Sequence, residues 1–245
     1  MKKKCHKILK LIKEVKAIDI LFFIAFFASV LISLTMDQTR LVYILPLVIV
    51  IIILKYLSYK NITVNKLFIF AALLVLVSDI LSLLNFFNHF TWIAILTASY
   101  LICLIIILIK YLSKSRLKSV MSLSVVLGML LVTYIIFAVV DLLINNIPTH
   151  FVIYTVFVAF CLFIFSITFA MVYISDKYVN GPVLLASGIF NIFQMTLSSI
   201  NEFFFYNRTF TAVIVICHIL SLYLFMKFIA EAKVVEIEDV DEKYF

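Results

Sequence analysis

The sequence predicts an all-α, polytopic membrane protein, folded as a bundle of eight transmembrane helices. Of its 245 residues, 66% are hydrophobic and only 13% are charged, whereas a soluble domain is typically about 45–50% apolar. Each membrane-spanning helix needs about 20 apolar residues, and the chain has enough of them for roughly eight spans. This composition excludes a soluble enzyme, a nucleic-acid-binding module and a disulfide-stapled secreted domain.

Eight apolar runs define the predicted helices, and short connections separate them. The runs cover 18–36, 41–57, 66–86, 90–109, 119–144, 151–174, 183–205 and 210–230. The first run follows a basic stretch, as in a signal peptide, but it is too long and lacks a small-residue cleavage pattern, so it is expected to remain as a span. The predicted organisation is a basic tail (1–17), a transmembrane domain (18–230) and an acidic tail (231–245). Function is therefore expected within the bilayer or at its surface.

The positive charges predict how the chain is oriented. All of the 20 Lys and Arg residues except Arg40 and Arg208 lie in the tails or beside the connections of one side. Cytoplasmic connections carry such an excess of positive charge, so both termini are predicted to be cytoplasmic. The protein is expected to be a multi-pass protein of a bacterial inner membrane.

Two spans carry matching polar stripes, spaced i, i+4 and i+7 on one helix face. The stripes consist of Ser78, Ser82 and Asn85 in the third span and of Gln194, Ser198 and Asn201 in the seventh. The two segments align when shifted by 116 residues, and spans four apart run in the same direction. This pattern indicates a parallel repeat of four plus four helices. The six residues are predicted to bind substrate, and ordinary interhelical hydrogen bonding is the alternative interpretation.

Asp79 is the strongest candidate for a functional residue, because a carboxylate inside a span is costly and should face the bundle interior. Glu202 and Asp141 are candidates for a second carboxylate, although Glu202 also fits a helix end that touches water. His218 in the last span is either a proton carrier or a packed, hydrogen-bonded histidine. The four cysteines are far apart and show no metal-ligand spacing, so neither a metal nor a cofactor is expected.

The span layout and a set of motifs resemble the YhhN-like family of integral membrane proteins, which includes the lysoplasmalogenases. The third span has the small residue and aspartate of that family at Ser78 and Asp79. The seventh-span positions that fit its pattern are Gly188, Phe190, Leu197, Ser199, Ile200, Asn201 and Phe203.

This resemblance implies a hydrolase that cleaves the vinyl ether bond of lysoplasmalogens to a fatty aldehyde and glycerophospho-ethanolamine or -choline. The implied partners are membrane lipids rather than nucleic acid. Such a reaction needs a proton delivered to carbon, followed by attack of water on an oxocarbenium-like species, which suits a pair of carboxyl groups.

The sequence departs from the family pattern at three places. The aspartate of the seventh span falls on Met195, the histidine of the fourth span on Thr97 and the glutamine of the eighth span on Ser221. Because cooperating catalytic residues act as a unit, these departures leave a second hypothesis open, in which the fold is retained for lipid binding without catalysis. A third hypothesis is a small transporter with Asp79 as its proton or cation site.

Overall fold

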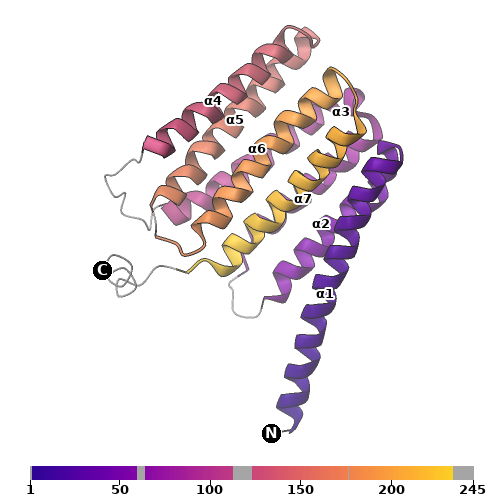
Figure 1. Cartoon of the computed structure of the whole chain (residues 1–245), viewed down its shortest axis with the longest axis vertical. Helices are drawn as coiled ribbons and strands as arrows, with labels where there is room; N and C mark the ends of the chain where they lie inside the picture. Colours follow the sequence, from indigo (N-terminus) through magenta and orange to yellow (C-terminus); the bar gives the residue numbers. More distant parts are fainter. Residues whose placement is uncertain (1, 60–63, 113–122, 176, 234–245) are drawn as a thin grey trace.

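The computed structural model describes residues 2–59, 64–112, 123–175 and 177–233. For residues 2–16 and 123–126, it describes the backbone alone. Within this part of the chain, long helices pack side by side into one bundle (Figure 1). The elements are α1 (Lys2–Thr35), η1 (Gln38–Arg40), α2 (Leu41–Ser58), α3 (Lys66–Leu112), α4 (Leu123–Ile144), α5 (Thr149–Ile174), α6 (Gly181–Phe203) and α7 (Arg208–Glu231). Among the described residues, seven helices are long and apolar enough to cross a membrane, which confirms an all-α, multi-pass membrane protein.

Residues 2–17 belong to α1, whose N-terminal part projects beyond the other helices (Figure 1). Most of the predicted acidic tail, 234–245, lies outside the described residues.

Local sequence also marks the helix ends. Pro182 stands in the first turn of α6, where a missing N–H costs little. Asn207 caps α7 by accepting a hydrogen bond from the backbone N–H of Thr209 at 2.8 Å.

Helix α3 is bent back on itself at Asn85. Its 47 residues would extend about 70 Å as a straight helix, more than twice the hydrocarbon thickness of about 30 Å. Asn85 has φ −161° and ψ 96°, an extended conformation within the helix. The hydroxyl oxygens of Ser78 and Thr97 lie 3.3 Å apart, whereas 19 residues of straight helix would separate them by about 28 Å. The two halves of α3 therefore lie against each other, although the sequence predicted two separate helices over 66–86 and 90–109.

The side chain of Asn85 explains how so short a reversal forms. Its Oδ1 accepts a hydrogen bond from the backbone N–H of Asn88 at 3.1 Å, which satisfies a donor at the start of the second half of α3. The remaining residues of the turn keep helical geometry. The reversal therefore needs only one non-helical residue and neither glycine nor proline.

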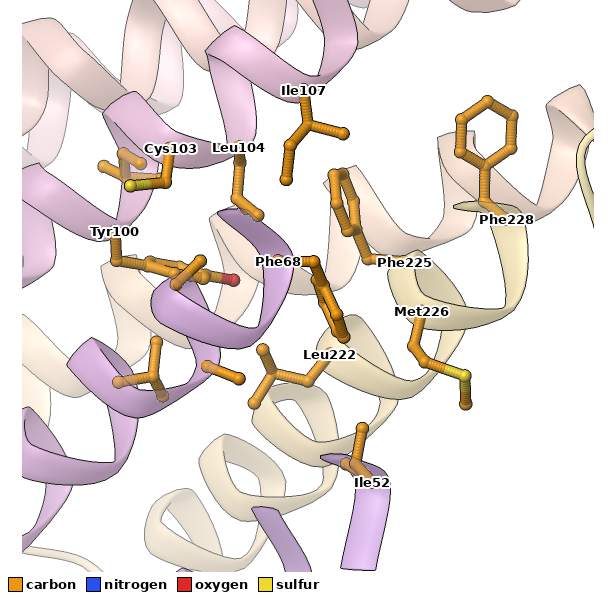
Figure 2. Packing of buried hydrophobic residues seen from close by; sticks show 14 of the residues in the cluster. Ile52, Phe68, Tyr100, Cys103, Leu104, Ile107, Leu222, Phe225, Met226 and Phe228 are labelled. Atoms are coloured by element: carbon orange, nitrogen blue, oxygen red, sulfur yellow. The ribbon is translucent and has the colours of Figure 1, made fainter. Parts of the chain in front are cut away.

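The apolar core joins α3, α7 and α2. Figure 2 shows side chains of α3 and α7 directed toward one another, with Ile52 of α2 beside them. The labelled members from α3 and α7 are Phe68, Tyr100, Cys103, Leu104, Ile107, Leu222, Phe225, Met226 and Phe228. Ring contacts of Phe225 with Phe68 and of Phe228 with Tyr111 link α7 to both halves of α3, and that arrangement positions the candidate site.

A buried cation attaches α1 to this core. Lys55 of α2 lies 2.6 Å from the carboxylate of Asp19 in α1 and donates a hydrogen bond to the hydroxyl of Tyr223 in α7 at 2.9 Å. Its ammonium group also lies 4.6 Å from the centre of the Tyr223 ring. Buried charges are tolerated when they are paired in this way, and the contacts join three helices at the end of the bundle opposite η1.

Replacing Gly188 with alanine is expected to destabilise the fold. An alanine Cβ at this position would lie 2.6 Å from ring carbons of Phe169, which is itself only 3% exposed. Such overpacking typically costs about 1–3 kcal/mol, so the thermal unfolding midpoint in detergent should fall. Gly128→Ala is the matched control, because nothing lies within 4 Å of the added Cβ and alanine has the higher helix propensity. Equal midpoints for the two variants would contradict this account of the α5–α6 contact.

Candidate functional site

The centre of the candidate site is a contact between Asp79 and His218. The Oδ2 atom of Asp79, in the first half of α3, lies 2.8 Å from Nε2 of His218 in α7. The two side chains are 17% and 8% exposed, respectively. At this distance, the carboxyl oxygen and the ring nitrogen form a hydrogen bond. The apolar bundle therefore contains a carboxyl–imidazole pair made of side chains that can accept or donate a proton.

The pair forms part of the wall of a cavity of about 180 Å³. Its polar lining comes from both halves of α3, from α6 and from α7. The polar lining residues from these helices are Ser78, Asp79, Ser82, Thr97, Tyr100, Gln194, Thr196, Ser198, Ser199 and His218, and Thr155 of α5 adds one more hydroxyl. The facing wall is apolar and comes mainly from α4, α5 and the second half of α3. It includes Ile93, Ala94, Ile136, Val139, Val140, Leu143, Val158, Ala159 and Leu162. We call this space the lipid-side cavity.

A second cavity, of about 70 Å³, lies against the same pair. It shares five residues with the first cavity, namely Asp79, Ser82, Gln194, Ser198 and His218. Its remaining lining comes from η1, α2, the first half of α3, the end of α6 and the start of α7. At its margin, the side-chain amide of Gln38 donates a hydrogen bond to Oε1 of Glu202 at 2.7 Å. We call this space the η1-side cavity.

Tyr100 lines the lipid-side cavity, and its hydroxyl is held by a hydrogen bond. The side-chain amide of Asn191, which is 2% exposed, donates a hydrogen bond to this hydroxyl at 2.9 Å. Because the tyrosine oxygen accepts this bond, its own hydrogen is available as a donor. Tyr100 can therefore donate a hydrogen bond to a polar group in the cavity.

The structure brings most of the predicted site residues together. Ser78, Asp79, Ser82, Gln194 and Ser198 line the lipid-side cavity, and Asn201 and Glu202 line the η1-side cavity. The side chain of Asn201 is already engaged, because it donates to the hydroxyl of Thr211 at 3.3 Å and accepts from the backbone N–H of Asn207 at 2.9 Å. These bonds join the end of α6 to the start of α7.

Two predicted residues line neither of these cavities. Asn85 is exposed at the bend of α3, where its side chain caps the following turn. Asp141 is exposed near the end of α4, and its backbone carbonyl accepts a hydrogen bond from the side chain of Asn145. The described structure therefore places Glu202, rather than Asp141, in the same polar region as Asp79.

Sequence reasoning left His218 without a defined role, although the structure makes it the partner of Asp79. The available signal was a histidine inside an apolar span, where such residues are uncommon. Met195 of α6 lines the lipid-side cavity together with Asp79 but supplies no ionisable group. The imidazole of His218 is therefore the group that accompanies Asp79 in this chain.

Comparison with known proteins identifies no relative. No protein-family model matches the chain, and no curated protein or solved structure matches it. What the structure establishes is a polytopic bundle of membrane-spanning helices with an internal polar site.

Proposed function

We propose that this chain is an intramembrane lipid hydrolase that cleaves the vinyl ether bond of lysoplasmalogens. The observation that carries the proposal is the Asp79–His218 contact at 2.8 Å in the wall of a cavity with one polar and one apolar side. The resemblance of the sequence to the YhhN-like family supports this choice of reaction. The products would be a fatty aldehyde and glycerophospho-ethanolamine or -choline.

The two-sided lining of the cavity suits an amphiphilic substrate. The polar residues of α3 and α6 would contact the oxygens near the reacting bond, and the aliphatic side chains of α4 and α5 would contact the hydrocarbon chain. At about 180 Å³, the cavity would hold the segment around the vinyl ether, while the rest of the lipid extends beyond it. Ser78, Ser82, Gln194 and Ser198 are the proposed substrate-binding residues.

The chemistry assigned to the pair is general acid–base catalysis. A proton from Asp79–His218 would be delivered to the vinyl carbon farther from the ether oxygen, giving an oxocarbenium ion. Water would then add to the carbon bonded to oxygen and return a proton to the pair. The resulting hemiacetal would break its bond to the glycerol oxygen, while its hydroxyl proton passes through the pair to that oxygen, which releases the aldehyde and the alcohol. Tyr100 would donate a hydrogen bond to the departing oxygen.

We also infer that the chain crosses the membrane eight times, with α3 contributing two spans. The contact between Ser78 and Thr97 supports this count, and so does the start of α1 at the same end of the bundle as the end of α7 (Figure 1). The distribution of lysine and arginine places that end in the cytoplasm. Two residues of each polar stripe, Ser78 and Ser82 of α3 and Gln194 and Ser198 of α6, line the lipid-side cavity, an arrangement that fits two parallel four-helix repeats.

A second candidate function is lipid binding without catalysis. The observation that favours it is Met195, which lines the cavity where the family pattern has a second carboxylate. In this alternative, the cavity would still hold an amphiphile, while Asp79 and His218 would serve as a buried, mutually satisfied pair.

Aldehyde release from a lysoplasmalogen by the detergent-purified protein tests the proposal. The matched control substrate is the lysolipid with a saturated alkyl ether, which has no double bond to protonate and should release no aldehyde. Release from the vinyl ether alone is the expected result. Binding of both lysolipids without release of aldehyde would favour the lipid-binding alternative.

A further inference from the structure

We propose that the η1-side cavity binds the water consumed in hydrolysis and delivers it to the pair by a route separate from the lipid. This inference rests on the proposed function, since it assigns the second substrate of the same site. The five residues shared by the two cavities include both members of the pair, Asp79 and His218. The pair therefore stands where a lipid on one side and a water molecule on the other can both reach it.

The size and lining of the η1-side cavity suit water. Its volume of about 70 Å³ has room for at least two water molecules at about 30 Å³ each. A buried water also needs two to four polar partners. Ser82, Gln194 and Ser198 supply them beside the pair, and Gln38 and Glu202 supply them at the margin.

A separate route is needed because the lipid would occupy the other approach. Once a lipid lies in the lipid-side cavity, with its hydrocarbon chain against α4 and α5 and its oxygens against the polar lining, it would exclude water from that approach. The η1-side cavity instead leads from the pair to the half-buried carboxylate of Glu202. Water arriving there would add to the oxocarbenium carbon and lose its proton to the pair.

Accessibility of a single cysteine tests the route. Ile214 lines the η1-side cavity one turn before His218 in α7, whereas its neighbour Val213 lines neither cavity and is 39% exposed on the outer face of the bundle. Ile214→Cys and Val213→Cys are made in a parent whose four native cysteines are replaced by alanine. The probe is Ag⁺, which displaces the proton of a water-accessible thiol. The thiols left unreacted are counted after denaturation.

The expected result is that Ile214→Cys reacts at least about tenfold faster than Val213→Cys, because only a thiol in contact with water ionises readily. The fast reaction should persist when Ala159→Phe narrows the lipid-side cavity. Leu83→Cys, which lines the η1-side cavity from α3, should repeat it, with the exposed Leu84→Cys as its control.

Two results would overturn the inference. One is equal, slow reaction at both cavity positions and at their lipid-facing neighbours. The other is a fast reaction that Ala159→Phe abolishes, because water would then arrive through the lipid-side cavity. Fast labelling of Ile214→Cys in a protein that releases no aldehyde would leave the water site in place and reject only the proposed reaction.

Discussion

Replacing Asp79 with asparagine is expected to lower the rate of aldehyde release by about 10²–10⁴-fold, the usual contribution of a general acid–base group. The asparagine side chain has nearly the same shape and can still hydrogen-bond to His218, but it cannot transfer the proton. The measurement is single-turnover aldehyde release from a lysoplasmalogen by detergent-purified wild type and variant. Asp37→Asn is the matched control, because Asp37 is exposed, pairs with Arg208 at 3.5 Å and lines neither cavity.

His218→Gln extends this test to the other member of the pair. Glutamine can hydrogen-bond to Asp79 but does not carry a proton at neutral pH, so a loss comparable to that of Asp79→Asn is expected if the two residues act as a unit. The double variant should then be no slower than either single variant. Unchanged release by folded Asp79→Asn protein would remove the pair from the reaction.

Filling the lipid-side cavity with Ala159→Phe is expected to weaken lysolipid binding at least about tenfold, which corresponds to about 1.4 kcal/mol. Ala159 lies in the cavity wall formed by α5, so the phenyl ring would occupy the space assigned to the substrate chain. Equilibrium binding of a lysolipid to the purified protein provides the measurement. Aldehyde release should fall with it.

The control for this variant is the same substitution on the lipid-facing side. Ala138 of α4 is exposed and lines neither cavity, so Ala138→Phe should leave binding unchanged. Equal binding by both variants would show that the lipid occupies another part of the protein. The lipid-binding alternative makes the same prediction, and therefore this experiment tests the site independently of the reaction.

The multi-pass helical fold was predictable because apolar length alone requires it: in lipid, each backbone polar group must be bonded within its own helix. The detailed form of α3 was not predictable. The sequence predicted one span over 66–86 and the next over 90–109. In the structure, the backbone of α3 leaves helical geometry only at Asn85. A single asparagine that caps the next turn leaves little trace in composition, because the same residue type also fits a polar stripe.

The candidate site was predictable as far as its polar residues had to face inward. Asp79 and Gln194 line one cavity because lipid offers them no partner. Asn201 belongs to the same stripe, yet its side chain forms hydrogen bonds with Thr211 and Asn207. A shared helix face therefore does not distinguish a residue that binds a ligand from one that joins two helices. The pairing of His218 with Asp79 depends on how α7 packs against α3, and no local pattern in either helix specifies that contact.

The most direct test of the hydrolase is the fate of the transferred proton. Wild-type protein is incubated with a lysoplasmalogen in D₂O. The aldehyde is trapped as it forms, and its mass is measured by mass spectrometry. Protonation of the vinyl carbon predicts one deuterium on the carbon next to the aldehyde group, and its formation should depend on Asp79. Folded protein that binds the lysolipid but releases no aldehyde would contradict the account and leave a lipid-binding membrane protein.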